Sequence, residues 1–128
     1  MIRTKGAKRG IEIGTFTGYS ALCMAEGLTD DGKLICLEKN EQYAELAKSY
    51  WSRAGVEHKI ELKIGHALDT LDEMMLIAEN HQSFDFAFID GDKSLYAEYV
   101  DKLLPLMRKG SFLMLDNTLW MGKVIDPN

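Results

Sequence analysis

The sequence lacks the features that usually mark a nucleic-acid-binding, membrane-spanning or secreted protein. It carries 15 Lys and Arg against 20 Asp and Glu, a formal net charge of −5, whereas nucleic-acid-binding domains usually show a basic face. No apolar run reaches the ~20 residues that span a bilayer. No apolar signal core follows the basic N-terminal segment MIRTKGAKRG. We therefore expect a cytoplasmic protein that binds neither nucleic acid nor membrane.

Cysteine is scarce too. The two cysteines, Cys23 and Cys36, form no CxxC pair or other metal-ligand spacing, and we interpret both as buried thiols in a reducing compartment. A chain of 128 residues, 46% of them hydrophobic, is long enough to bury a core without disulfides or structural metal. At this length one domain is the default, so we expect residues 1–128 to form a single domain.

Short apolar runs alternate with stretches of helical periodicity along the chain. This alternation predicts strands at 10–14, 33–37, 60–64, 85–89 and 112–115, and helices at 19–28, 41–54, 68–78 and 96–104. Gly55 is the expected stop of the helix over 41–54. The apolar stripe of that helix comprises Tyr43, Ala47, Tyr50, Trp51 and Ala54. Repeated β-α units of this kind predict an α/β fold, a parallel sheet with helices on both faces.

Small or acidic residues follow each expected strand. They are Gly14, Glu38, Gly65, Asp90 and Asp116. In an open α/β sheet the carboxyl ends of the strands share one edge, and ligands bind there. We therefore expect the functional residues in these loops.

The first loop, EIGTFTGYS, differs from a dinucleotide-binding GxGxxG motif. Bulky residues separate Gly14 from Gly18, which leaves a poor cradle for a pyrophosphate. The N-terminus of the following helix can still hold a carboxylate, and Glu12 can accept a hydrogen bond from an ammonium group. Together they suit the zwitterionic end of an amino-acid-like cofactor, and a plain tight turn is the alternative.

The second and third loops carry further candidates for cofactor binding. An acid in the place of Glu38 commonly accepts hydrogen bonds from ribose hydroxyls, although an acid there can also favour the dipole of the next helix. In GHALDTL the backbone N–H of Ala67 is a candidate donor to adenine, and we interpret His66 as a capping or surface residue. The two acids and the glycine loop together indicate an adenosine-bearing cofactor, with S-adenosylmethionine favoured over a dinucleotide.

Oxygen ligands for a divalent cation follow the last two expected strands. Asp90 ends one of these strands in FIDGDK, and Asp116 and Asn117 end the other in LDNTLW. Neighbouring strands would bring the three side chains together, and such a set suits Mg²⁺, Mn²⁺ or Ca²⁺. Sulfur and imidazole are missing from the set, which argues against zinc. Helix capping by these acids is the alternative, but the segment after Asn117 is a poor helix start.

The motifs EIGTFTGYS, AGVEHKIEL, FIDGDK and DNTLWMGKV occur in an order and spacing that resemble the cation-dependent O-methyltransferases of the caffeoyl-coenzyme A and catechol type. The resemblance implies a Rossmann-like class I S-adenosylmethionine-dependent methyltransferase fold with strand order 3-2-1-4-5. Its implied cofactor-binding residues are Glu12, Gly14, Gly18, Ser20, Glu38, Ala67 and Asp90. Its implied metal ligands are Asp90, Asp116 and Asn117. Lys93 takes the place of the family's general base, and Trp120 that of an aromatic wall near the substrate.

The implied reaction moves a methyl group from S-adenosylmethionine to a hydroxyl of a small catechol-like or caffeoyl-type acceptor. A divalent cation would favour the phenolate, and Lys93 would take the proton unless it forms an ion pair with Asp92 or Asp90. A nicotinamide-dependent oxidoreductase on the same kind of sheet is a weaker alternative, because GxGxxG is missing. A non-catalytic module that binds cofactor or a partner chain is the second alternative.

Parts of the family's pattern have no counterpart in the sequence. His66 stands where the family commonly has a small or acidic residue. The family has helices before its first strand and two further strands after the DN motif, so we expect a fragment or natural truncation whose sheet lacks the last two strands. The strand over 112–115 would then be a bare apolar edge, which promotes association. We therefore expect a homo-oligomer, lowered stability and weak catalysis.

Overall fold

A mixed sheet flanked by helices forms the framework of the protein. The computed structural model describes residues 8–14, 19–89, 93–115 and 120–123. The strands are β1 (Arg9–Ile13), β2 (Lys33–Glu38), β3 (Ile60–Ile64), β4 (Phe84–Ile89), β5 (Met107–Leu115) and β6 (Trp120–Lys123). The helices are α1 (Tyr19–Glu26), α2 (Glu41–Ala54), α3 (Ala67–Met75) and α4 (Tyr96–Leu103). Short 3₁₀ turns occupy Glu57–Lys59, Ala78–Asn80, Lys93–Leu95 and Leu104–Leu106.

The strands follow the order β3-β2-β1-β4-β5-β6. The first five are parallel to one another, so the expected α/β fold and the order 3-2-1-4-5 are confirmed. The expectation that 112–115 forms a bare edge is wrong, because β6 pairs with β5 in antiparallel register, Phe112 opposite Lys123. The described residues after Asn117, 120–123, form a strand, and the aromatic Trp120 that opens β6 is a residue type that favours strands. The argument for self-association from a bare β5 therefore does not apply.

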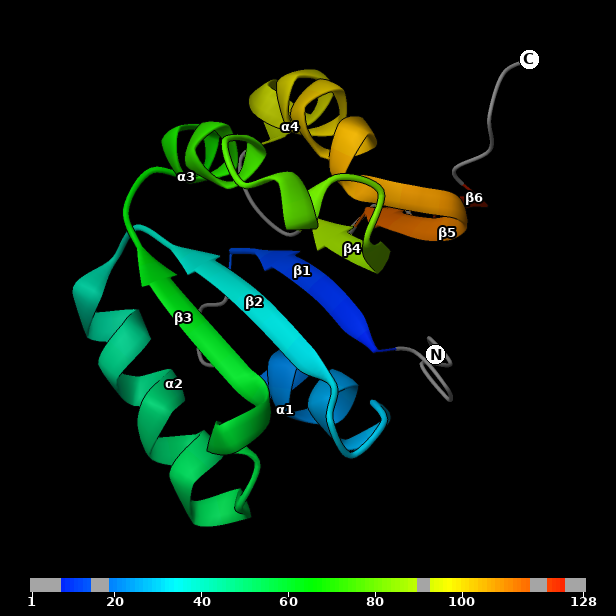
Figure 1. Ribbon diagram of the computed structural model, residues 1–128. Helices are drawn as coiled ribbons and strands as arrows, with labels where there is room; N and C mark the ends of the chain where they lie inside the picture. Colours follow the sequence, from blue (N-terminus) through cyan, green and yellow to red (C-terminus); the bar gives the residue numbers. More distant parts are fainter. Residues whose placement is uncertain (1–7, 15–18, 90–92, 116–119, 124–128) are drawn as a thin grey trace.

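Helices cover both faces of the sheet. α1 and α2 lie on one face, and α3 and α4 lie on the other (Figure 1). Alternate strand residues point to opposite faces, so Ile13 and Leu37 pack in the core under α3 and α4. Cys36 packs with Trp51 in the core on the side of α1 and α2. The stretches 34–37 of β2 and 86–89 of β4 are therefore apolar on both faces, as is usual for parallel strands in a two-sided sheet, whereas β1 carries the buried Glu12 on the side of α1 and α2.

The two cysteines differ in their surroundings. Cys36 is fully buried in β2, as expected, but Cys23 on α1 is exposed. The expectation of two buried thiols is therefore wrong for Cys23, because its position on α1 faces away from the sheet.

No helix in the described part of the chain is long and apolar enough to cross a membrane.

Helix α2 shows how local signals set its two ends. The Asn40 side chain accepts hydrogen bonds from the backbone N–H groups of Gln42 and Tyr43 at 2.9 and 3.1 Å, which satisfies donors that no helical carbonyl reaches. Gly55 ends the helix as expected, with φ of 76°, a left-handed conformation that glycine adopts without a steric penalty. Both bounds of the predicted helix, 41 and 54, are therefore confirmed.

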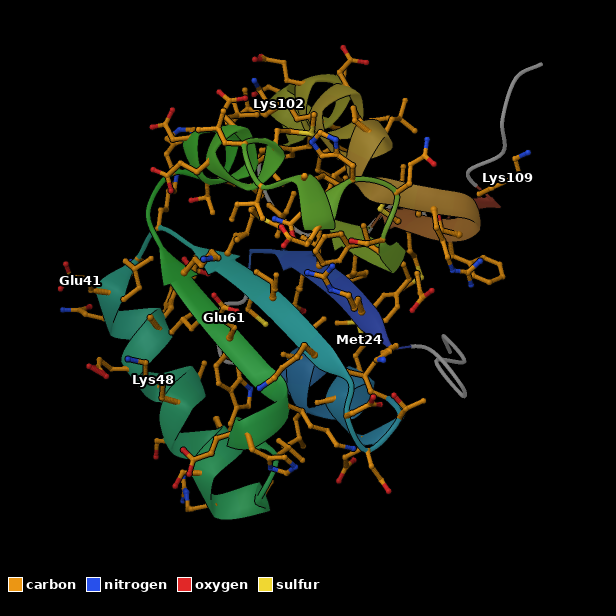
Figure 2. The ribbon with its side chains drawn as sticks, viewed as in Figure 1. Met24, Glu41, Lys48, Glu61, Lys102 and Lys109 are labelled. Atoms are coloured by element: carbon orange, nitrogen blue, oxygen red, sulfur yellow. The ribbon has the colours of Figure 1, made fainter. Side chains whose placement is uncertain are left out.

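The buried face of α2 differs from the expected stripe. The buried residues are Ala44, Ala47 and Trp51, whereas Tyr43 and Tyr50 are 42% and 45% exposed. Small alanines let the helix approach the sheet closely, while a tyrosine at the flank keeps its hydroxyl in water. Glu41 and Lys48 point away from the sheet (Figure 2).

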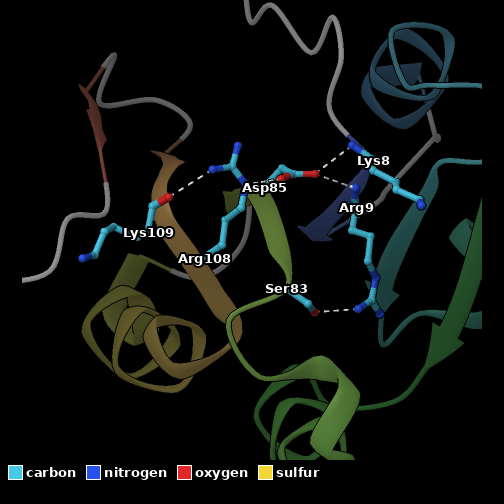
Figure 3. Close-up of polar contacts among 6 residues, drawn as sticks. All are labelled: Lys8, Arg9, Ser83, Asp85, Arg108 and Lys109. Atoms are coloured by element: carbon cyan, nitrogen blue, oxygen red, sulfur yellow. Dashed lines mark hydrogen bonds and ion pairs between the residues drawn. The ribbon is translucent and has the colours of Figure 1, made fainter.

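A polar network ties the amino ends of β1, β4 and β5 together (Figure 3). Oδ2 of Asp85 accepts hydrogen bonds from the backbone N–H groups of Lys8 and Arg9 at 2.7 and 3.0 Å, and its Oδ1 accepts one from Nε of Arg108. The Arg9 guanidinium donates to Oγ of Ser83 at 2.5 Å. One carboxylate thus links three strands at the end of the sheet that lies opposite the candidate loops.

The pKa of Asp85 lies below its usual range. Burial raises this pKa, but the hydrogen bonds from Arg108 and from the backbone of Arg9 and Lys8 lower it by more. A carboxyl group whose pKa is lowered by folding stabilises the folded state above its unfolded pKa, ~3.9, and this stabilisation is lost as the pH falls through the folded-state pKa.

We expect Asp85→Asn to lower the free energy of unfolding at neutral pH by about 1–3 kcal/mol, the scale of hydrogen bonds to a charged group. The difference from the wild type should start to shrink as the pH falls below the unfolded pKa of about 3.9, and should disappear as the pH falls through the lower folded-state pKa. Urea unfolding across this pH range measures both effects. Asp31→Asn is the matched control, because Asp31 is an exposed carboxylate whose ion pair with Lys8, 3.0 Å long, lies at the surface. Equal losses in both variants would contradict the role given to Asp85.

Candidate cofactor-binding site

A pocket of about 240 Å³ opens at the carboxyl ends of the central strands. Its walls come from the ends of β1 and β2, the loop after β3, and the first turns of α3 and α4. The lining residues are Ile13, Gly14, Leu37, Glu38, Lys39, Gly65, His66, Ala67, Leu95 and Tyr99. This volume is below the ~300 Å³ at which small-molecule sites usually begin. It suits one part of an extended cofactor.

Backbone hydrogen bonds fix the loops around this pocket. The N–H of Gly14 donates to the carbonyl of Leu37 at 2.8 Å, and the N–H of Gly65 donates to the carbonyl of Glu38 at 3.0 Å. Gly14 has φ of 85°, which a residue with a side chain adopts only with strain. The glycine after β1 therefore turns the chain sharply without adding a side chain at the pocket wall.

Glu38 places a carboxylate at the pocket. The residue is only 5% exposed, and its Oε2 accepts a hydrogen bond from the backbone N–H of Asn40 at 3.0 Å. That bond lies just before α2, so the interpretation of Glu38 as a helix-terminus acid holds in part. A carboxylate has about four acceptor positions, so the same group can also receive hydrogen bonds from a pair of ligand hydroxyls.

The start of α3 forms a second polar wall. Ala67 is the first residue of the helix and is buried, and the first N–H groups of a helix have no acceptor within it. Its N–H is therefore suited to donate to a ligand, and its contact with adenine stays a prediction. His66 occupies the N-cap position, but its side chain makes no capping hydrogen bond and is exposed. The side chain of His66 therefore lies at the surface, as expected, but it does not cap the helix. Because His66 also lines the pocket, the interpretation against a ligand role stays a prediction.

Glu12 lies deeper in the sheet than expected for a ligand-binding acid. It is fully buried, with Cys36 of β2 and Phe88 of β4 as its register partners. The thiol of Cys36 donates a hydrogen bond to its Oε1, with 3.6 Å between sulfur and oxygen. Among the described residues, Glu12 is not part of the pocket wall.

Several expected site residues lie outside the described part of the chain. They are Gly18, Asp90, Asp92, Asp116 and Asn117, together with the side chains of Ser20, Lys93 and Trp120. Ile89 and Leu115, the last residues of β4 and β5, are register partners, so the chain enters 90–92 and 116–119 from paired positions. Within the described ranges no group of His, Cys, Asp and Glu side chains could hold a metal ion. The metal ligands stay a prediction.

Sequence reasoning missed five residues of the pocket wall, Ile13, Leu37, Lys39, Leu95 and Tyr99. Leu95 and Tyr99 line the pocket from the start of α4, and Tyr99 is only 5% exposed. Their spacing of four residues puts them on one helical face, but the same pattern describes an ordinary core residue. The useful signal was their position just after β4, at the ligand-binding edge of the sheet. Ile13, Leu37 and Lys39 lie beside the predicted Gly14 and Glu38, at the ends of β1 and β2.

Comparison with known proteins places the chain in a family. The O-methyltransferase family profile matches residues 1–128. Caffeoyl-CoA O-methyltransferase 2 of Zea mays is 44% identical over 128 residues, which are 100% of this chain and 48% of that protein. Tricin synthase 1 of Oryza sativa subsp. japonica is 41% identical over 130 residues, covering 99% of this chain and 52% of that protein. The chain thus spans about half the length of the curated relatives it matches.

Solved structures agree with this placement. The O-methyltransferase TomG from Streptomyces achromogenes, in complex with SAM, matches with a TM-score of 0.84 and 38% identity, over 90% of this chain and 51% of that one. The O-methyltransferase from Bacillus cereus, in complex with SAH, matches with a TM-score of 0.83 and 36% identity over the same shares. The profile match over every residue, the similar sequences and the shared fold show that this chain belongs to the O-methyltransferase family.

Proposed function

We propose that this chain binds S-adenosylmethionine and forms the cofactor-binding part of an O-methyltransferase that acts on a hydroxyl of a small catechol-like or caffeoyl-type acceptor. The observation that carries the proposal is the buried carboxylate of Glu38, held at the wall of a pocket beside the start of α3. The family match over the whole chain supports it. The relatives' names support the choice of acceptor class.

The described residues fit a nucleoside. Glu38 would accept hydrogen bonds from the two ribose hydroxyls, and the N–H of Ala67 would donate to adenine. Leu95 and Tyr99 contribute apolar surface on which a flat base can pack. The methionine end would then extend toward Gly14, the last described residue before 15–18.

The remaining residues of the proposed site follow from the family resemblance. Gly18 and Ser20 would contact the methionine end of the cofactor together with Glu12, and Asp90 would contact the cofactor as well. Asp90, Asp116 and Asn117 would hold a divalent cation, with Mg²⁺, Mn²⁺ and Ca²⁺ as candidates, because their ligand atoms are all oxygen. The pairing of Ile89 with Leu115 supports this set, since Asp90 and Asp116 are the next residues in the chain.

The sulfonium of the cofactor supplies an activated methyl group, and a bound divalent cation supplies positive charge that favours the phenolate form of the acceptor. Lys93 would take the proton from the acceptor hydroxyl, as a general base does. An ion pair of Lys93 with Asp92 or Asp90 is the alternative. Holding acceptor and cofactor in line would contribute much of the rate, because a positioned nucleophile reacts as if at very high concentration.

We expect Glu38→Gln to weaken binding of S-adenosylhomocysteine by about 1–3 kcal/mol, the scale of hydrogen bonds to a charged group. Isothermal titration calorimetry on the 128-residue chain measures the affinity. Glu45→Gln is the matched control, because Glu45 is an exposed acid on α2, away from the pocket. A folded wild-type chain that binds no S-adenosylhomocysteine would refute the cofactor assignment.

The proposed cation should bind to the chain itself. We expect Asp116→Asn to weaken Mn²⁺ binding by more than about tenfold, the loss that even an outer partner of a metal ligand causes. Electron paramagnetic resonance counts the free Mn²⁺, and Asp101→Asn on the exposed side of α4 serves as control.

Methyl transfer to a catechol panel should stop in EDTA and return with Mg²⁺ or Mn²⁺. Undiminished turnover in EDTA would contradict the metal role of Asp90, Asp116 and Asn117.

Removal of the proposed base should affect the chemical step alone. We expect Lys93→Ala to lower kcat by roughly 10²–10⁴-fold, the usual contribution of a general base, with the affinity for S-adenosylhomocysteine unchanged. Steady-state kinetics and calorimetry separate the two effects, with Lys48→Ala on the outer side of α2 as control (Figure 2). An equal loss in both quantities would favour the ion-pair role of Lys93.

A further inference from the structure

A buried thiol touches a buried carboxylate in the middle of the sheet. Glu12 of β1 and Cys36 of β2 are register partners on neighbouring strands. Both are 0% exposed, and Sγ of Cys36 donates to Oε1 of Glu12 across 3.6 Å. The side chain of Cys36 in β2 therefore contacts an acid that lies one residue before the end of β1.

The surroundings of this contact are mostly apolar. Phe88 of β4 is the register partner of Glu12 on its other side, and the core on this face of the sheet includes Ala21, Met24 and Phe86. A buried carboxylate is costly unless donors satisfy its oxygens. A thiol is a weak donor, but this one is held by the β1–β2 register and needs no ordering when a ligand binds.

We propose that Cys36 is a positioning residue for Glu12, one that orients its carboxylate toward the ammonium group of the cofactor. This rests on the proposed function, in which Glu12 contacts the methionine end. The hydrogen bond from the thiol holds Oε1 of Glu12 toward β2 and so restricts rotation of the carboxylate. The other atoms around Glu12 then set the direction of Oε2. Cys36 itself would not touch the cofactor.

Packing alone is the competing explanation, and it predicts a different response to substitution. If Cys36 only fills space, Ala and Ser at this position both leave a small gap, and Ser also adds a buried hydroxyl. If Cys36 positions Glu12, Ser keeps the donor and Ala removes it. The two roles are therefore distinguished by which variant, Cys36→Ala or Cys36→Ser, binds the cofactor more tightly. A comparison of melting temperatures does not distinguish them.

We expect Cys36→Ala to weaken binding of S-adenosylhomocysteine by roughly threefold to tenfold, the effect of losing one hydrogen bond. Cys36→Ser should bind within about twofold of the wild type, because its hydroxyl is also a donor. Cys23→Ala, at the exposed cysteine of α1, should bind like the wild type. Calorimetry on the 128-residue chain gives the affinities, and thermal melts show that each variant is folded.

Infrared spectroscopy tests the contact without a ligand. In the Cys23→Ala background only the thiol of Cys36 remains, and its S–H stretch should lie at the low frequency of a hydrogen-bonded thiol. Glu12→Gln should move this band to higher frequency, because a neutral amide oxygen accepts more weakly than a carboxylate. A band that does not respond would overturn the inference whatever the calorimetry shows.

The two proposals fail in different ways. Tight binding by both the wild type and Cys36→Ala would overturn the positioning role and leave the cofactor assignment intact. Weaker binding by Cys36→Ser than by Cys36→Ala would also overturn it, in favour of packing. A wild-type chain that binds no S-adenosylhomocysteine would overturn the cofactor assignment and the positioning role with it.

Discussion

Parallel pairing of β1 with β2 on one side and β4 on the other is the constraint on which the candidate site depends. The pairing brings Ile13 beside Leu37 and Ile89, so three loops leave the sheet from one edge. Without this alignment Gly14 could not donate to the carbonyl of Leu37, nor would Glu38 face the start of α3. The Asp85 network holds the amino ends of β1, β4 and β5 together and so stabilises the same alignment from the opposite end.

The two acids proposed to bind the cofactor, Glu38 and Glu12, lie in different surroundings, and this difference suits the different tasks proposed for them. Glu38 ends β2, where a backbone N–H fixes one of its oxygens and the pocket borders the carboxylate. Glu12 lies one residue before the end of β1 and is enclosed by Cys36 and Phe88. An acid at the rim of a pocket suits neutral hydroxyls, whereas a buried acid gains most from a cationic partner, because a low dielectric strengthens the attraction between charges.

Patterns within single segments predicted much of the fold. The helix over 41–54 was bounded correctly because Asn40 and Gly55 act locally, through a side-chain cap and a left-handed turn. The apolar runs of β2 and β4 were visible because strands buried on both faces are mostly apolar, and β1 was recognised although it carries the buried Glu12. β5 was expected only from Phe112, but it begins at Met107, since the polar residues Arg108 and Lys109 hide its first half. The strand β6 was missed, because only the pairing with β5 makes 120–123 a strand.

The sequence by itself determined the order of the first five strands and the four helices along the chain, the acids that end the strands, and the family, because local spacing and short motifs encode all of these. Only the tertiary structure decided that Glu38 and Ala67 share a pocket with Tyr99, that Glu12 contacts Cys36, and that Cys23 is exposed. Each of these facts depends on the register between two strands or the face on which a helix packs. Such relations join segments far apart in the chain, and they form only when the whole sheet and its two helical layers bury their apolar surfaces together.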